Sequence, residues 1–155
     1  MKFVKSSVVV VLLAVISIFV SGCGAREPMD VNVFRSVMEA ENYEITDFLP
    51  RQAENAELFR NHLIVTTENY EITFAELIED AYARNVFNGV RAQVENNRGS
   101  VHTSTTVNAV NHNMFEQTSG GVFAHIYRVD NTVLYVIADS EYRSHVRELI
   151  GRIVP

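Results

Sequence analysis

The chain has 155 residues and is acidic, with 13 Lys and Arg, 19 Asp and Glu, and a formal net charge of −6. Nucleic acids and anionic lipid headgroups bind concentrated positive charge, so this composition argues against both as partners. The length suffices for one domain with a hydrophobic core but not for two. The single cysteine excludes a disulfide within a monomer.

The first 22 residues have the layout of a secretory signal. Lys2 and Lys5 precede a continuous apolar run over residues 8–20, and small residues then lead into Cys23. An uncleaved transmembrane anchor is one alternative, although the apolar run is short against the roughly 20 residues that a membrane span needs. A free catalytic thiol at Cys23 is another, but it needs a histidine close by in the sequence, and none is there. We expect residues 1–22 to be an export signal and no part of the folded domain.

The end of this signal resembles the lipobox of bacterial lipoproteins. The lipobox pattern is Leu, Val or Ile, then a small residue, then Gly or Ala, then Cys, and here the four places hold Val20, Ser21, Gly22 and Cys23. The resemblance implies diacylation of the Cys23 thiol, cleavage before it, and a mature protein held on the extracytoplasmic face of the cell membrane. Two acyl chains anchor a protein stably, where one binds only marginally.

A short tether is expected to follow the lipid. Residues 23–29 contain turn-forming residues and show no hydrophobic periodicity, so we interpret them as a lipidated tether. Residues 30–155 are then expected to form a single extracytoplasmic domain that lies close to the membrane surface. Contact with the membrane is predicted to come from the lipid on Cys23, because the protein itself is acidic.

The domain begins with a predicted helix and strand. Asp30 can cap a helix because apolar residues follow it at spacings of three and four, and Asn42 can end that helix. Residues 43–46 alternate between apolar and polar side chains, which predicts a strand. Residues 53–60 are expected to be irregular or briefly helical.

A hairpin and a second helix come next. Residues 62–67 and 70–77 are two strand-like runs separated by a two-residue turn. Asp80 can then cap a helix that ends near Asn96. In the predicted hairpin, apolar side chains share one face and form two facing pairs, Leu63 with Phe74 and Val65 with Ile72.

The second half of the chain is predicted to be mostly strand. Residues 101–110 are β-branched but polar, which is typical of an edge strand. Residues 113–118 form a short strand, and residues 122–129 and 132–138 form a second hairpin. Both faces of this hairpin are largely apolar, which predicts that it lies at the centre of the sheet.

The order of these elements indicates the fold class. Asp139 or Ser140 is expected to cap a last helix with an apolar stripe. The order α-β-β-β-α-β-β-β-β-α lacks the strict strand-helix alternation of a parallel sheet. It predicts an α+β fold, with an antiparallel β-sheet and helices packed on it. The stripe of the last helix consists of Tyr142, Val146, Leu149 and Ile150.

Two family resemblances agree with this location and class. Residues 122–153, two hairpin strands and a terminal amphipathic helix, are similar to the close of PsbP-like α/β/α sandwiches, some of which are bacterial lipoproteins. More of the chain resembles a group of uncharacterised lipoproteins common in Gram-positive clostridia. This resemblance implies a lipid-anchored protein, in a Gram-positive cell rather than a Gram-negative one, and supplies no activity. The segments that carry it are residues 34–39, 70–77, 119–121 and 128–133.

The sequence offers few candidates for catalysis or metal binding. The five histidines lack His-x-x-x-His and His-Glu-x-x-His spacings, and His102 and His112 have no adjacent carboxylate. Ser119 stands before two glycines, but the Gly-x-Ser-x-Gly pattern of a nucleophile elbow is absent. We therefore expect no metal site, no cofactor and no catalytic residue.

His125 and Tyr127 are the candidate ligand-binding residues. His125 stands between Phe123 and Tyr127 on one face of a predicted strand, which is an unusual place for a histidine. It is either a half-buried histidine with one backbone hydrogen bond or, with Tyr127, a contact for a ligand. The predicted hairpin register places His125 opposite Val136 and Tyr127 opposite Leu134.

Three classes of function stay open. A membrane-tethered binding or accessory module without catalytic activity is favoured, because an anchor and a compact domain are predicted and no catalytic set is found. A surface interaction or immunity-type protein that masks a basic partner is the second class, suggested by the acidic composition. An extracytoplasmic hydrolase is the third, and it would require a pocket with converging His and carboxylate groups.

Overall fold

The computed structural model describes residues 25–48 and 56–155. In this part of the chain, seven strands and three α-helices follow the order α-β-β-β-α-β-β-β-β-α, so the predicted α+β class is confirmed. Two 3₁₀ turns complete the structure, at Ala56–Leu58 and Ser140–Tyr142. The elements are α2 (Val31–Ala40), β1 (Thr46–Asp47), β2 (Phe59–Thr66), β3 (Tyr70–Leu77), α3 (Asp80–Asn96), β4 (His102–Asn108), β5 (His112–Ser119), β6 (Val122–Val129), β7 (Thr132–Asp139) and α4 (Arg143–Ile153).

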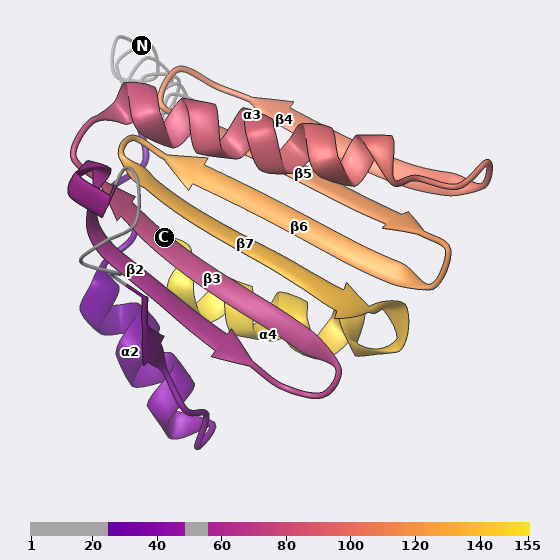
Figure 1. Cartoon of the computed structure of the whole chain (residues 1–155), viewed down its shortest axis with the longest axis horizontal. Coiled ribbons are helices and arrows are strands. Elements are labelled where there is room, and N and C mark those ends of the chain that lie inside the picture. Colours follow the sequence, from indigo (N-terminus) through magenta and orange to yellow (C-terminus); the bar gives the residue numbers. More distant parts are fainter. Residues whose placement is uncertain (1–24, 49–55) are drawn as a thin grey trace, which may run out of the picture.

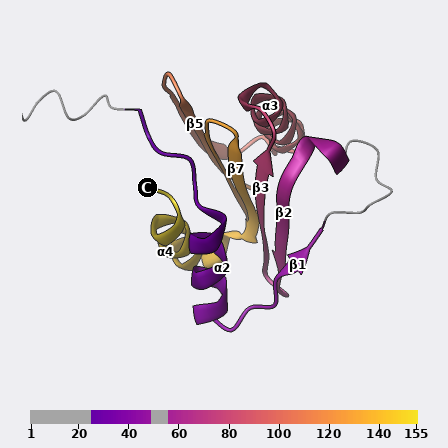
Figure 2. The same ribbon diagram turned by 90° about the vertical axis from the view of Figure 1, so that its left-hand side faces the viewer.

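The strands form one antiparallel sheet between two layers of helix. Their order across the sheet is β1-β2-β3-β7-β6-β5-β4 (Figure 1), and every neighbouring pair is antiparallel. The helices α2 and α4 cover one face and α3 covers the other (Figure 2). Within the two described ranges, no helix is long and apolar enough to cross a bilayer.

The start of the domain follows the prediction only in part. The Asp30 side chain accepts a hydrogen bond of 2.7 Å from the Asn32 backbone N–H and caps α2, and Asn42 ends the helix in the left-handed conformation with φ 61°. The strand predicted over residues 43–46 is wrong except at Thr46, where β1 begins. Residues 49–55 lie outside the described part of the chain.

Tyr43 explains why the predicted strand does not form. Its ring meets that of Tyr70 edge-on at 6.0 Å, and its hydroxyl lies 3.1 Å from the Nε2 atom of His145 on α4. Burial and a hydrogen bond with Tyr43 raise the pKa of Tyr70 above its usual range. These contacts hold the chain after α2 against β3 and α4 rather than in the sheet.

The first hairpin has the predicted register. In the β2–β3 pair, Leu63 lies opposite Phe74 and Val65 lies opposite Ile72, and all four side chains are buried. The alternation of apolar residues and the two-residue turn are both local signals, so the sequence alone defines this pairing.

The second hairpin also has the predicted register. His125 lies opposite Val136 and Tyr127 opposite Leu134, and the turn between the strands uses Asp130 with a positive φ of 46°. Strand β7 lies at the middle of the seven-stranded order, with β6 beside it. The predicted central position of this hairpin is confirmed, and so is the edge position of β4, whose side chains are all exposed.

The predicted caps of α3 and α4 are wrong. Glu79 occupies the cap position of α3, and Asp80 instead uses its carboxylate to bind Arg84 at 2.7 Å and the buried Arg128. Before α4 the chain forms a 3₁₀ turn, so the helix begins at Arg143 without a side-chain cap. In both places a tertiary contact or a tighter turn replaces the local hydrogen bond that the sequence suggested.

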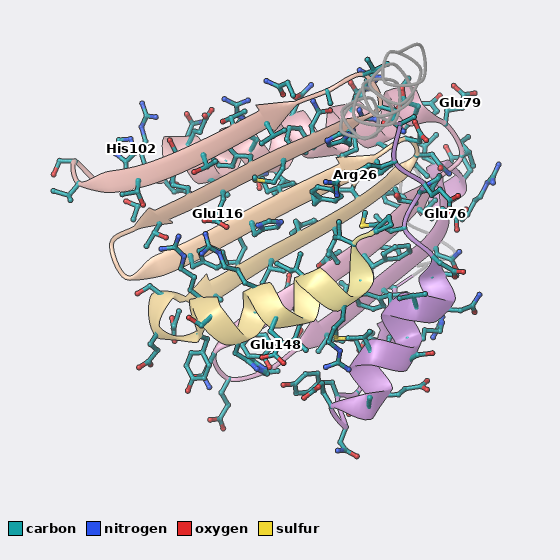
Figure 3. All side chains as sticks on the ribbon, turned by 180° about the vertical axis from the view of Figure 1, so that it is seen from behind. Arg26, Glu76, Glu79, His102, Glu116 and Glu148 are labelled. Carbon is teal, nitrogen blue, oxygen red and sulfur yellow. The ribbon has the colours of Figure 1, made fainter. Side chains whose placement is uncertain are left out.

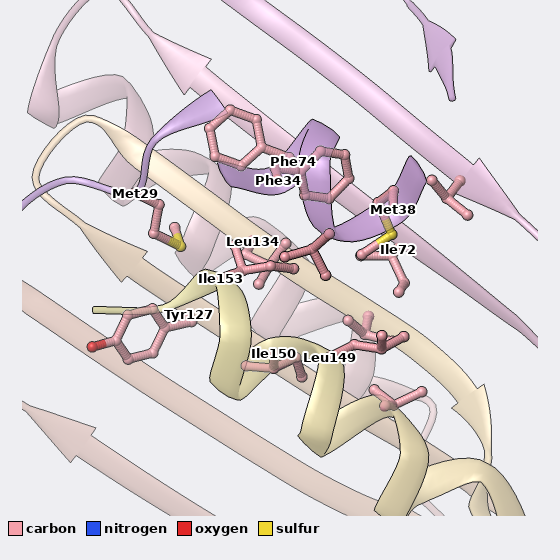
Figure 4. Close-up of a cluster of buried hydrophobic side chains, with 14 of the residues drawn as sticks. Met29, Phe34, Met38, Ile72, Phe74, Tyr127, Leu134, Leu149, Ile150 and Ile153 are labelled. Carbon is pink, nitrogen blue, oxygen red and sulfur yellow. The ribbon is translucent and has the colours of Figure 1, made fainter. Parts of the chain in front are cut away.

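The hydrophobic core is larger on the α2/α4 face of the sheet. Two phenylalanines, Phe34 of α2 and Phe74 of β3, pack with ring centroids 5.3 Å apart in this core. Met29, from the segment expected to be a tether, is buried in the same core (Figure 4). A smaller cluster on the α3 face contains Ala75, Leu77, Ala83, Phe87, Phe115, Ile126 and Val133.

Candidate functional site

A groove of about 700 Å³ lies on the α3 face of the sheet. It runs beside the second half of α3, over the ends of β5, β6 and β7 that meet at the β5–β6 turn. Its walls are largely apolar. The apolar lining residues are Val90, Val94, Val122, Ala124, Tyr135 and Ile137.

The sequence of α3 leaves this space open. Phe87 fills the gap between the first half of the helix and the sheet and is buried. The next two turns toward the sheet carry only Val90 and Val94, which are shorter, so the side chains of the sheet below them are not covered. Val122 and Ile137 accordingly stay 44% and 36% exposed, although both belong to central strands.

Gln117 places a polar group in this apolar groove. Its side chain is 4% exposed, and its Nε2 donates a hydrogen bond of 3.2 Å to the backbone carbonyl of Val94. Its Oε1 is buried and has no hydrogen-bond partner among the described residues. An unpaired buried acceptor costs about 1–3 kcal/mol, so a hydrogen-bond donor that reaches Oε1 from the groove removes this cost.

The charge of the groove is low. Among the described residues, the lining contains one carboxylate, that of Glu71, an exposed residue of β3, and no Lys, Arg or His. The remaining polar lining comes from amides, from Tyr135 and from Ser119, whose hydroxyl accepts a hydrogen bond of 2.9 Å from the Gly99 N–H. This environment suits an uncharged ligand and disfavours an anion.

A second polar cluster lies on the opposite face, around the buried Glu116 (Figure 3). Arg147 and Arg143 of α4 both bind this carboxylate, with Arg147 Nε at 3.0 Å and Arg143 Nη2 at 3.2 Å. The Nδ1 atom of His125 lies 3.4 Å from it. Burial favours the neutral acid, but hydrogen bonds from His125 and Arg147 outweigh burial and lower the pKa of Glu116 from 4.5 to about 2. The cluster fastens α4 to β5 through ion pairs.

The structure places His125 and Tyr127 in this second cluster and not in the groove. His125 is buried and bonds the Glu116 carboxylate, where the sequence had suggested a backbone hydrogen bond. The Tyr127 ring stacks 6.4 Å from that of His125, with the Arg26 guanidinium 5.8 Å from the tyrosine ring centre. Burial raises the pKa of Tyr127. Their contact with a ligand stays a prediction.

Two other predictions from the sequence concern the lipobox and the lack of a metal site. Val20, Ser21, Gly22 and Cys23 lie outside the residues that the structure describes, so the lipobox stays a prediction. Within the described ranges, no group of three His, Cys, Asp or Glu side chains converges to hold a metal ion.

Sequence reasoning missed the groove for a physical reason. The apolar faces of the β6–β7 hairpin predict a central position with partial cover on both sides, but they do not indicate which part of the hairpin α3 leaves open. Two signals were present: the small valines at Val90 and Val94 and the polar Gln117 within a strand. Neither reveals a groove without knowledge of which strands lie under α3.

Comparison with known proteins gives little further information. No protein-family model matches the chain, and no curated protein matches it. Among solved structures, a GTP binding regulator from Thermotoga maritima is similar, with 14% sequence identity and a TM-score of 0.47 over 81% of this chain and 84% of that chain. A likeness at this level supplies no argument about function.

Proposed function

We propose that this chain is a membrane-anchored extracytoplasmic lipoprotein that serves as a non-catalytic binding module, with its ligand in the groove beside α3. The observation that carries the proposal is the combination of exposed apolar side chains with one buried, unpaired amide acceptor. Small-molecule sites are commonly apolar clefts of about 300–1,000 Å³ in which a few polar groups fix the orientation of the ligand. The groove falls within that range at about 700 Å³.

The lining also indicates the chemistry of the ligand. Val122 and Ile137 offer apolar surface, and the unpaired Gln117 Oε1 is an acceptor for one hydrogen bond from a ligand. Glu71 repels anions, and no cationic side chain within residues 25–48 and 56–155 lines the groove to offset it. The ligand class that fits is an uncharged small molecule with an apolar body and one N–H or O–H donor.

The same lining supports binding rather than catalysis. Ser119 is the one serine or threonine among the described lining residues, and its oxygen is engaged by Gly99 and Val101. A serine nucleophile needs a base within hydrogen-bond reach, and the lining residues that the structure describes include no histidine. The proposed role is therefore to capture or present a ligand.

The lipid anchor has a direct test. The mature protein should carry two acyl chains on an N-terminal Cys23, and Cys23→Ala should release it from the membrane fraction, because an acidic domain has no other strong attachment. Intact-mass spectrometry of the purified protein and cell fractionation measure the two. An unmodified cysteine, or membrane retention of the Cys23→Ala variant, would contradict the proposal.

The groove is tested by titration with N-phenyl-1-naphthylamine, a neutral fluorophore with an apolar body and one N–H. We expect a saturable rise in fluorescence that Val122→Arg weakens several-fold, because the charged side chain obstructs the groove. Val107→Arg is the matched control, since Val107 is 40% exposed but lies on edge strand β4. Absence of saturable binding, or equal losses in both variants, would refute the groove as the site.

A further inference from the structure

The first described residues of the chain are bound to the domain. The Arg26 backbone N–H donates to Asn111 Oδ1 at 3.2 Å, and Asn111 Nδ2 donates to the Arg26 carbonyl at 2.7 Å. The Arg26 guanidinium also donates to the Pro155 carbonyl at 2.8 Å. Three residues later, the buried Met29 donates its N–H to Thr132 Oγ1 at 3.1 Å. The backbone is therefore held in place from Arg26 onward.

The surface that holds Arg26 is one end of the sheet. Asn111 belongs to the β4–β5 turn. Its backbone carbonyl accepts a hydrogen bond of 2.9 Å from the N–H of Asp130, which lies in the β6–β7 turn. Figure 3 shows Arg26 toward this end of the molecule and His102 toward the opposite end. We call the surface formed by the β4–β5 and β6–β7 turns the tether end.

The covalent chain limits how far the tether end can lie from residue 23. Only two residues separate Arg26 from Cys23. An extended chain advances at most about 3.6 Å per residue, so their Cα atoms are no more than about 11 Å apart. If Cys23 carries the lipid, as the proposed function states, the tether end lies within that distance of the lipid attachment point.

The composition of the tether end is compatible with contact with a bilayer. Val110, next to Asn111, is an apolar side chain with 92% exposure. The β4–β5 turn carries no charged side chain over residues 109–111, and the β6–β7 turn contributes one carboxylate, Asp130, which accepts a hydrogen bond of 3.3 Å from Asn111 Nδ2. The tether end therefore carries one carboxylate and the bound Arg26, and lacks the excess of negative charge of the chain as a whole.

We propose that the domain stands on the membrane through its tether end, with Val110 in contact with the lipid headgroups and the groove directed away from the bilayer. The groove lies at the β5–β6 turn, which is at the far end of β6 (Figure 1). An eight-residue strand such as β6 extends for about 24 Å at its usual rise per residue. A ligand from the extracytoplasmic space then enters the groove without obstruction by the membrane.

Two exposed valines at opposite ends of β4 provide the test. Val110 is 92% exposed at the tether end, and Val101 is 85% exposed at the groove end. In the acylated protein the native cysteine is blocked, so Val110→Cys or Val101→Cys introduces the one reactive thiol. Each full-length lipidated variant is labelled with the fluorophore NBD and reconstituted into phosphatidylcholine vesicles that contain a headgroup spin label. Quenching should be several-fold stronger at position 110 than at position 101.

A further variant connects the orientation to the bound tether. Asn111→Ala removes the side chain that holds Arg26, so quenching at position 110 should fall toward the value at position 101. Equal quenching of both labels in a protein that floats with the vesicles would overturn the orientation and leave lipid anchoring intact. A protein with unmodified Cys23 that does not float would refute the anchor itself, and with it the orientation.

Discussion

The two faces of the sheet differ in how completely helices cover them. On the α2/α4 face, Phe34, Phe74 and Leu134 are fully buried. On the α3 face, Val122 and Ile137 stay partly exposed at the groove. The comparison indicates that this domain uses one face of its sheet for stability and leaves space for binding on the other.

Simple dimensions explain the difference. A helix is about 10 Å across and strands lie about 4.8 Å apart, so one helix covers roughly two strands. Two helices on one face can cover most of the central strands, whereas α3 alone cannot. The part of the α3 face that stays open is the part where the helix carries Val90 and Val94 rather than larger residues.

The largest expected effect is the loss of stability when a core side chain is truncated, compared with truncation of a side chain in the groove. Leu134→Ala should lower the free energy of unfolding by about 2–5 kcal/mol, because it leaves a cavity among fully buried neighbours. We expect a similar loss for Ile126→Ala in the smaller core. Ile137→Ala on the same strand as Leu134, and Thr105→Ala on β4, should each cost less than about 1 kcal/mol. Urea denaturation measures all four, and equal losses would contradict the assignment of closed and open faces.

The next effect is a pH dependence that belongs to the closed face. The pKa of Glu116 is lowered to about 2 in the folded protein, so its ion pairs stabilise the fold above pH 4.5, and this contribution is lost as the pH falls toward 2. We expect the free energy of unfolding to fall by about 1–3 kcal/mol over this pH range. The partial exposure of Arg143 and Arg147 weakens their ion pairs and places the loss toward the lower value. Glu116→Gln should flatten stability between pH 5 and pH 2 in denaturant titrations. Glu148→Gln, an exposed substitution on α4, serves as the control, and an unchanged pH profile in Glu116→Gln would refute the role of the cluster.

The smallest expected effect concerns the N-terminal caps of two helices that lie on opposite faces of the sheet. Asp30 caps α2 through its side chain, so Asp30→Ala should lower the free energy of unfolding by about 1 kcal/mol. Glu79 occupies the same position before α3 without a side-chain bond, so Glu79→Ala should change it by less than about 0.5 kcal/mol. Thermal and urea unfolding of both variants measure the difference. A larger loss for Glu79→Ala would show that the cap was assigned to the wrong helix.

Local sequence patterns predicted both hairpins. The position of the groove instead depends on which strands are covered by α3 in the folded molecule. The registers of both hairpins followed from alternation and two-residue turns, as the pairing of Leu63 with Phe74 shows. Glu116 and Arg147 lie 31 residues apart, so no local signal announced their ion pair. The groove depends on which strands α3 covers, and that is a property of the packed molecule rather than of any segment.

The most direct test of the binding groove is a residue-resolved NMR titration of the mature protein in lipid nanodiscs with N-phenyl-1-naphthylamine. We expect saturable chemical-shift changes at the Gln117 side-chain amide and at Val122 and Ile137, with His125 and Tyr127 unchanged. Changes centred on His125 and Tyr127, with the groove residues unaffected, would contradict it and move the binding site to the α4 face.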